Sequence, residues 1–383
     1  MIVDSRYILF FTRAFRGFVY GVFSVITIIL LVDDGINPIL AGLVVTASIV
    51  MSSLLTLYIT THYGLGYSKS FLLVFSVLLF LGVTGIYLFP SPLIKALFVV
   101  IGSLGVNPSD NTLFSSFEQP IISKIKENQN SRNRLFSVYS FFGYTASSIG
   151  AVTLQFGIGN VILMSSILSM ATLILYLFLP HIDGKLKIFS NPVSRRSKII
   201  ARDVSVLFSI DAIGGGFVLQ SLMAYWFKIR YNFNLDELGY VFTAVDIIMA
   251  ISVLITPFIA SKIGLVNTMV FTHLPSNIFL ALIPVVPNLY ASLIFLFLRQ
   301  SLSQMDVPTR QSYLNSVVDA EDRSYVTGTS NASRNLSNGA TPYISSYLIS
   351  IGAGSASFIS GGIIKILYDL LIFFRFRSER EKY

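Results

Sequence analysis

The sequence contains no cysteine and only three histidines among its 383 residues. Without cysteine there is no disulfide framework, no thiolate metal site and no cysteine nucleophile, and histidines this sparse do not predict a metal centre. We therefore expect neither a metal nor a cofactor. Charged residues are also scarce, at 12% of the chain, against about a quarter in soluble proteins.

Apolar residues take the place of charge. They make up 54% of the chain, and the mean hydropathy is +0.72, which predicts a protein whose surface faces lipid. A helical span needs roughly 20 apolar residues, so the chain has room for about twelve spans joined by short loops. The first apolar run follows Asp4, exceeds a signal-peptide core and lacks a small-residue cleavage site, so we expect a retained first span.

Apolar runs bounded by glycine, proline, asparagine and charge divide the chain into two sets of six spans. The expected spans are 7–32, 38–60, 70–89, 93–117, 134–156 and 160–180, then 203–227, 237–261, 266–287, 289–311, 324–349 and 351–374. We predict an all-α membrane protein with twelve transmembrane helices in two pseudo-symmetric six-helix bundles. The N-terminal bundle covers 1–182, a basic cytoplasmic linker covers 183–202, and the C-terminal bundle with a short charged tail covers 203–383.

The basic residues are distributed very unevenly over the expected loops. Of 27 lysines and arginines, nineteen fall on one side, three fall on the other (Lys95, Lys228 and Arg230), and five lie within spans. Because basic loops stay in the cytoplasm, this asymmetry predicts a multi-pass plasma-membrane protein with both termini inside. The basic residues are spread over seven segments rather than one face, so they do not predict nucleic-acid binding.

The two halves resemble each other at an offset of about 200 residues, the internal repeat that transporter folds often carry. THYG (61–64) matches SKIG (261–264), Pro108 matches Pro308, and RAFRGFV (13–19) loosely matches DAIGGGFV (211–218). Their consistent order predicts duplication of a six-helix unit.

With twelve spans, a basic linker after the sixth and short loops between the second and third spans of each half, the chain resembles the major facilitator superfamily over its whole length. The family's loop motif is degraded here: TTHYGLGYSKS (60–70) keeps Gly64 and Lys69 but has Thr61 where an acid usually stands, which removes the usual salt bridge at that loop. SQMDVPTRQSYLNSVVDAEDRSYVTGTSNASRNLSNGATP (303–342) is similar to the region of the family's tenth and eleventh helices.

The resemblance implies a monomeric secondary transporter in contact with membrane lipids, which moves a small-molecule substrate by alternating access and is not an enzyme. No G-x-x-x-x-G-K-[ST] nucleotide motif is present. We therefore expect protons to drive transport.

Ionisable residues within spans are the candidates for this coupling, since they are costly in hydrocarbon unless they have a partner or face a cavity. Asp246, in FTAVDIIMAIS, has apolar neighbours on both sides. Desolvation favours the protonated form of a carboxyl group, as a proton carrier requires. The alternative is a fixed ion pair with Arg299. Asp211, in the seventh span, is the second candidate for proton coupling.

Other charges are candidates for a gate or for structural ion pairs. Asp306 and Arg310 are four residues apart, so they can pair on one helix face. Asp110 occupies the position of the repeat that corresponds to Arg310, which leaves a bridge between the halves open. Arg13 and Arg16 lie about two turns inside the first span, where they either serve the gate or extend to the headgroups.

A polar stripe on the eleventh span is the candidate solute site. Asn331, Arg334, Asn335 and Asn338 recur at helical spacing, and Arg334 suits either an anionic group or a balancing aspartate. The alternative is helix packing through amide hydrogen bonds. Further candidates for the solute cavity are Arg299, Tyr139 and Tyr144. On the fifth span, Gly143, Ser147 and Ala151 predict close helix packing first.

Phenylalanine and tyrosine together number 51, which favours proton-coupled efflux of amphipathic compounds, as in an antiporter. Arg334 and the asparagines favour the alternative, proton-coupled uptake of a polar or anionic nutrient. A non-transporting receptor or a lipid scramblase on the same fold is a further possibility.

Overall fold

The computed structural model describes residues 5–62, 67–105, 112–125, 129–180, 193–318 and 322–376, which form helices and turns without a strand in those ranges. The first elements are α1 (Ser5–Asp33), α2 (Pro38–His62), α3 (Ser68–Leu88), α4 (Pro92–Ile101), α5 (Thr112–Ile125), α6 (Gln129–Val152), the short 3₁₀ helix η2 (Thr153–Phe156) and α7 (Ile158–Leu177). They are followed by α8 (Arg195–Gly216), α9 (Gln220–Tyr231), α10 (Leu235–Ile263), α11 (Leu265–Leu282), α12 (Leu289–Ser303), α13 (Asp306–Val317), α14 (Arg323–Asn338), α15 (Pro342–Ser350) and α16 (Gly354–Phe376).

Helices occur at all twelve expected positions, and four of those positions hold a pair of helices: α4 with α5, α8 with α9, α12 with α13 and α14 with α15. Eight stretches of the described residues are long and apolar enough to cross a membrane. The expected all-helical membrane protein is thus confirmed, whereas the count of twelve spans in two bundles stays a prediction. The expected spans that are not among the eight are 93–117, 289–311 and 324–349, each divided between two shorter helices, and 134–156, where α6 begins with a polar stretch.

The interruptions within the paired helices follow from local sequence. Three glycines at 214–216 end α8. Glycine disfavours a helix because it loses more backbone conformational entropy there than other residues and has no side chain to pack. Pro342 starts α15, a position where its missing N–H group costs nothing. After α4, Gly105 adopts a φ of 84°, a conformation that only glycine reaches without strain.

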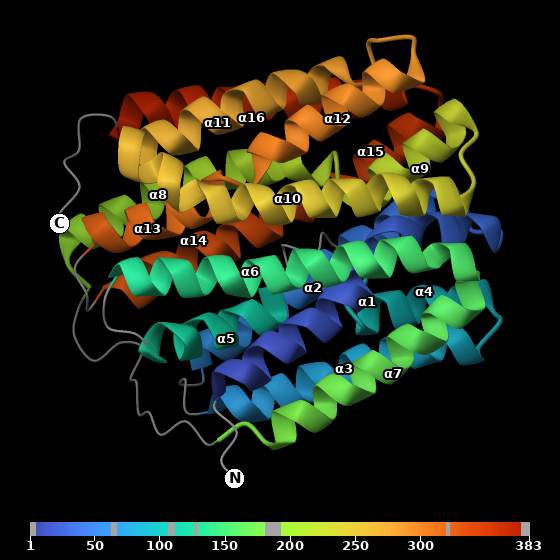
Figure 1. Cartoon of the computed structure of the whole chain (residues 1–383), viewed down its shortest axis with the longest axis horizontal. Coiled ribbons are helices and arrows are strands. Elements are labelled where there is room, and N and C mark those ends of the chain that lie inside the picture. Colours follow the sequence, from blue (N-terminus) through green and yellow to red (C-terminus); the bar gives the residue numbers. More distant parts are fainter. Residues whose placement is uncertain are drawn as a thin grey trace.

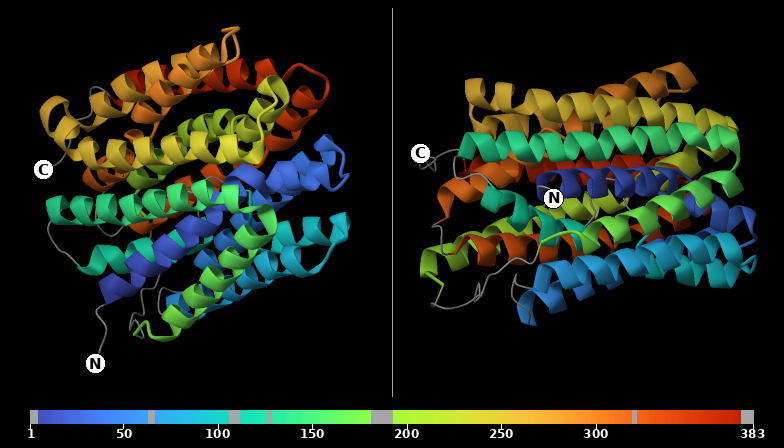
Figure 2. Two further views of the ribbon diagram at one scale, coloured as in Figure 1. Left: turned by 45° about the vertical axis from the view of Figure 1, so that its right-hand side comes forward. Right: turned by 60° about the horizontal axis from the view of Figure 1, so that its bottom comes forward.

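The helices form two groups (Figures 1 and 2). In the N-terminal group, α1–α7, the central α1 packs on α6 and α7. In the C-terminal group, α8–α16, α8 packs on α14 and α16. Helix α1 begins and α16 ends at one end of the molecule, on the left of Figure 1, which we call the termini end. Helices α9 and α15 lie toward the opposite end.

The two groups are joined along α6 and α10, and also where α1 meets α9 and α2 meets α15. At the opposite end, Lys228 Nζ lies 2.6 Å from Asp33 Oδ2. Further in, the hydroxyl of Thr243 donates to the carbonyl oxygen of Ser148 at 3.1 Å. These bonds tie the groups together from the opposite end inward.

Small residues allow the central helices to approach closely. A Cβ atom added at Gly21 of α1 would lie 2.4 Å from the backbone oxygen of Ser147 on α6. On the other side of α6, a Cβ added at Gly239 of α10 would lie 2.7 Å from the oxygen of Ala151. The stripe predicted to pack on the fifth span therefore does so, and it packs against helices of both groups.

We expect Gly21→Ala to lower the melting temperature of the detergent-solubilised protein, at a cost of about 1–3 kcal/mol, because its methyl group collides with backbone that cannot move independently. Gly159→Ala in the first turn of α7 is the matched control, because a Cβ there meets nothing within 4 Å. Equal melting temperatures for the two variants would contradict the close approach of α1 and α6.

Candidate functional site

The described helices bury a set of ionisable side chains, most of which lie in two clusters. The buried cations are Arg13, Arg16, Arg299, Arg310 and Lys365, and the half-buried Arg334 lies beside the second cluster. The buried carboxyl groups are Glu118, Asp211, Asp246, Asp306 and Asp369. Because charge at membrane depth is expensive, such residues are the first candidates for function.

The first cluster, in the N-terminal group, centres on an ion pair between Arg16 of α1 and Glu118 of α5. Arg16 Nη2 lies 2.5 Å from Glu118 Oε2, and both side chains are fully buried. Three hydroxyl groups also donate to the carboxylate: Tyr139, Tyr176 at 2.6 Å and Thr12 at 3.2 Å. Both carboxylate oxygens of Glu118 therefore accept hydrogen bonds from several donors, which suits a structural role.

This cluster decides the alternatives for three candidates. Arg16 does not extend to the headgroups, because its guanidinium is held by Glu118 and lies 4.3 Å from the ring centre of Phe114. Arg13 is buried too, with its guanidinium 5.1 Å from the ring centre of Tyr139. The hydroxyl of Tyr139, a candidate for the solute cavity, is used by Glu118 instead.

The second cluster, in the C-terminal group, surrounds Asp211 of α8. Lys365 Nζ of α16 lies 2.5 Å from Asp211 Oδ1. The other cations are farther away: Arg310 Nη1 is 3.6 Å and Arg334 Nε is 4.0 Å from Asp211 Oδ2. Asp211 is thus shared among several positive groups, which stabilise its ionised form.

In both groups an ion pair joins the first helix to a later one, with the charges exchanged. In the N-terminal group the cation Arg16 is on α1 and its partner Glu118 is on α5. In the C-terminal group the anion Asp211 is on α8 and the cation Arg310 is on α13.

The expected pair of Asp306 and Arg310 is present, with Arg310 Nη1 3.2 Å from Asp306 Oδ2. Arg310 therefore bridges Asp306 and Asp211 within the C-terminal group. Asp110, which would have made the bridge between the halves, lies outside the described residues, as does Gly64 of the degraded loop motif.

Asp246 lies where the two groups meet. It is fully buried on α10, and Ser147 of α6 donates a hydrogen bond from its hydroxyl to Asp246 Oδ2. The amide side chain of Gln220 lies beside it. Within the described part of the chain, Asp246 has no charged partner, so the alternative of a fixed pair with Arg299 does not hold in this structure.

The polar stripe of α14 is divided between different surroundings. Asn331 is exposed, whereas Asn335 and Asn338 are buried. The backbone oxygen of Asn338 would lie 2.3 Å from a Cβ added at Gly216 of α8, so this end of the stripe packs against its own group. Tyr144 of α6 reaches the C-terminal group by donating its hydroxyl to Gln304 Oε1 at 2.8 Å.

Sequence reasoning missed Glu118, His273 and Asp369 as site residues and did not select Lys365. Glu118 follows directly on the expected span 93–117. Asp369 and Lys365 face inward from an otherwise apolar α16, and an ionisable residue within a span was the signal that could have found them.

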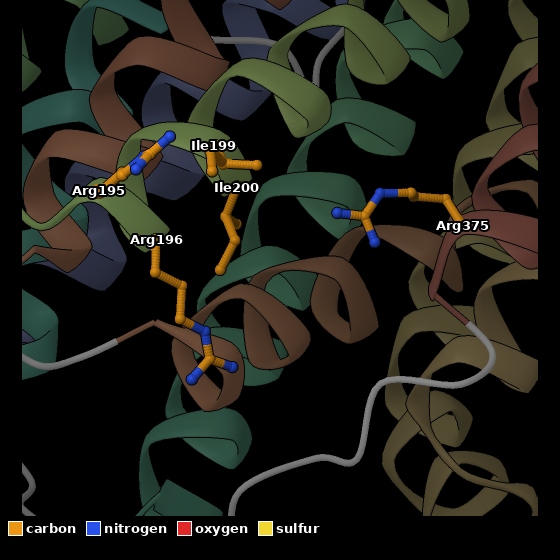
Figure 3. A pocket seen from close by; sticks show the side chains of 5 residues that line it. All are labelled: Arg195, Arg196, Ile199, Ile200 and Arg375. Carbon is orange, nitrogen blue, oxygen red and sulfur yellow. The ribbon is translucent and has the colours of Figure 1, made fainter.

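A cavity of about 330 Å³ lies away from both clusters, between the start of α8 and the last turn of α16 (Figure 3). Arg195, Arg196, Ile199, Ile200 and Arg375 line it. Arg375 points across toward the two isoleucines and is anchored by Asp203 Oδ2 at 2.9 Å. No member of the buried clusters lines this cavity, so it is not the candidate solute site.

A sequence profile described as the Major Facilitator Superfamily matches residues 229–383. The structure superposes on the crystal structure of the human organic anion transporter MFSD10 with a TM-score of 0.73, at 13% identity, covering 96% of this chain and 98% of that one. The part matched by the profile is less than half of the chain, and over that part the chain is similar to the superfamily. The likeness to MFSD10 shows a shared fold.

Two further transporters of known structure are similar over nearly the whole chain. The nucleoside transporter NupG, solved as a point mutant, has a TM-score of 0.72 at 11% identity, covering 97% of this chain and 100% of that one. A bacterial homologue of the human lysosomal transporter Spinster, in an inward-facing and unoccupied conformation, has a TM-score of 0.70 at 10% identity, covering 97% and 96%.

An uncharacterized membrane protein of Saccharomyces cerevisiae, YJR124C, is 28% identical over 184 residues, which are 48% of this chain and 41% of the yeast protein. The match thus spans less than half the length of that relative.

We expect Glu118→Gln to destabilise the protein by about 3–5 kcal/mol, because it leaves Arg16 buried without its counter-charge. Unfolding in detergent would measure this loss. Asp34→Asn is the control: its pair with Lys95 is partly exposed, at 2.7 Å, and should contribute at most about 1 kcal/mol. The double variant Arg16→Met with Glu118→Gln should recover part of the loss, and a double variant that is less stable still would contradict a paired charge.

Proposed function

We propose that this protein is a proton-coupled secondary transporter that takes up a small organic anion by alternating access, as the two helix groups rock about the buried clusters. The observation that carries the proposal is Asp246: a fully buried carboxyl group, without a charged partner among the described residues, at the contact between the groups. Efflux of an amphipathic compound in exchange for protons is the alternative.

Asp246 has the properties that a proton carrier needs. A buried carboxyl group without a cation beside it favours the neutral, protonated form, and its link to Ser147 spans α10 and α6. Loss of its proton would place an uncompensated charge at this contact. Protonation of Asp246 thus favours the closed contact of α6 and α10, and deprotonation favours its rearrangement.

The charges of the clusters support an anionic solute. Among the described residues, five buried cations face five buried carboxyl groups, so one positive charge is in excess when Asp246 is protonated, and the half-buried Arg334 adds another beside Asp211. Arg299 is buried, and the described residues place no carboxylate within 4 Å of it. Since an unpaired buried charge costs several kcal/mol, an anion that enters with a proton balances the site.

The aromatic residues, which favour the alternative of amphipathic efflux, contribute little to the contact between the two helix groups. Phe71, Phe75, Phe114 and Phe117 pack on one another in tilted and edge-on arrangements within the N-terminal group. Other large rings, such as Phe374, are exposed on the outer surface of the helices. The crystal structure of MFSD10 is that of an organic anion transporter, which agrees with the charge argument.

The contacts between the groups fit one state of an alternating-access cycle. The Lys228–Asp33 pair and the α6–α10 contact close the opposite end, and the chain shares its fold with an inward-facing, unoccupied transporter. We propose that this end faces the cell exterior and that both termini lie in the cytoplasm of a plasma-membrane protein that works as a monomer.

We expect Asp246→Asn to abolish proton-driven accumulation while leaving solute exchange intact, because asparagine keeps the hydrogen bond of the protonated acid and cannot release a proton. The measurement is uptake into proteoliposomes with and without a pH gradient. Asp236→Asn, exposed in the first turn of the same helix, is the control and should accumulate solute normally. Accumulation that survives in Asp246→Asn would remove Asp246 from the coupling.

The solute is first identified by a thermal-shift screen of carboxylates, sulfonates and phosphate esters, with neutral and cationic compounds for comparison. Arg334→Ala should then weaken binding of the anionic hit about tenfold or more, the loss of one charge-assisted hydrogen bond, with little change in melting temperature. Arg202→Ala, whose side chain is 73% exposed, should bind normally. Stabilisation by cationic solutes alone would overturn the proposal, as would lipid flipping without solute movement.

A further inference from the structure

His273 of α11 lies between two carboxyl groups in the C-terminal group, and the proposed role of Asp246 leaves it unused. Its Nδ1 atom lies 2.7 Å from Asp369 Oδ1 of α16, and its Nε2 atom lies 3.9 Å from Asp211 Oδ1 of α8. All three side chains are buried. A histidine held between two acids inside a membrane protein is a candidate for proton binding.

The geometry indicates which ring nitrogen takes up the proton. A nitrogen and a carboxylate oxygen 2.7 Å apart require a proton between them, so Nδ1 is committed to Asp369. Asn277 fixes that carboxylate by donating from Nδ2 to Asp369 Oδ2 at 2.8 Å. This leaves Nε2, which faces Asp211, as the position that gains or loses a proton.

Close helix packing holds this array together. A Cβ added at Gly362 of α16 would lie 2.9 Å from the oxygen of Asn277 on α11, and one added at Gly214 of α8 would lie 2.9 Å from the oxygen of Gly361. Helices α8 and α11 therefore each approach α16 at backbone distance. This packing keeps the helices that carry the three side chains close together.

Asp211 connects the histidine to the candidate solute site. Its carboxylate is already shared by Lys365 and, at longer range, by Arg310 and Arg334. A proton on Nε2 adds a further positive charge facing Asp211. The attraction of one carboxylate is divided among all the cations around it. A positive charge on His273 therefore weakens the attraction between Asp211 and Arg334 the most, because Arg334 Nε is the farthest of the three cations from the carboxylate, at 4.0 Å.

We propose that Nε2 of His273 is a second proton-binding position in this protein, and that its proton draws Asp211 away from Arg334, which then binds the solute anion. The second half of this statement rests on the proposed function. Proton binding and anion binding then strengthen each other by the same factor, as linkage requires.

Charged and titratable groups act on His273 directly or through Asp211. Asp369, Lys365 and Tyr368 on α16, Asp211 on α8 and Asp306 on α13 act on His273 itself. Arg310 on α13, Arg334 on α14 and Arg299 on α12 act on Asp211. The acids favour a proton on His273, and the cations oppose it. Removal of an acid should therefore lower the titration midpoint of His273, and removal of a cation should raise it.

The test uses the scarcity of histidine. The chain has only His62, His181 and His273, so full-length protein labelled with ¹⁵N-histidine in lipid nanodiscs gives three ring systems, and His273→Gln assigns the relevant one. We expect the His273 ring to carry its neutral-form proton on Nδ1 and Nε2 to titrate within about pH 5 to 8. An Nε2 that stays in one protonation state throughout would overturn the proposal with the wild-type protein alone.

Two variants test the connections. Asp369→Asn should move the midpoint to lower pH by about one unit, a tenfold loss of proton affinity, because it removes a negative charge. Arg334→Ala should move it to higher pH, because Asp211 is then shared with one cation fewer. His62→Gln, at the last residue of α2, should leave the midpoint unchanged. An unchanged midpoint in Arg334→Ala would overturn the link between the histidine and Arg334.

The outcome is separable from that of the proposed function. If Nε2 titrates as expected but no anion in the thermal-shift screen binds, the proposed proton-binding position is supported and the proposed anion transport is contradicted. If an anion binds with an affinity that does not change across the titration of His273, the proposed transport is supported and its coupling through His273 is contradicted.

Discussion

The cost of placing charge where water cannot reach it is the constraint on which this structure depends. An ion in a low-dielectric interior loses several kcal/mol of solvation, and only a close counter-charge with additional hydrogen bonds offsets that loss. The fold meets this demand by bringing helices distant in sequence to within hydrogen-bonding distance. Arg16 and Glu118 are 102 residues apart in the chain, and Lys365 and Asp211 are 154 residues apart. The glycines that let α8, α11 and α16 touch are therefore also what allows Asp211 and Lys365 to meet.

The two helix groups solve the same problem differently. In the N-terminal group, Glu118 is surrounded by one guanidinium and three hydroxyl donors, so nothing there depends on a further ligand. In the C-terminal group, Asp211 is shared by several cations, and Arg299 has no carboxylate within ion-pair distance among the described residues. The charge of Glu118 is thus neutralised within its own cluster, whereas the charge balance of the C-terminal cluster depends on how Asp211 is shared among its cations. We infer that ligand chemistry belongs to the second half.

Much of the site could be predicted where the signal was local. Asp306 and Arg310 are one helical turn apart, so their pairing follows from helix geometry. The packing of Gly143, Ser147 and Ala151 likewise follows from their spacing. Asp246 was identified because its neighbours along the chain are apolar, and it is indeed buried. The missed residues, Glu118, His273 and Asp369, differ in that their importance depends on partners about a hundred residues away, and no pattern along one helix contains that information.

The sequence by itself determined that this is an all-helical membrane protein and where its helices lie, because hydrophobicity and helix periodicity act over neighbouring residues. Only the tertiary structure decided which charges meet: that Arg16 is neutralised by Glu118, that Asp246 contacts Ser147 rather than Arg299, and that His273 lies between two acids. These outcomes depend on how helices from separate parts of the chain rotate and pack, and each is fixed by the need to offset buried charge across helices.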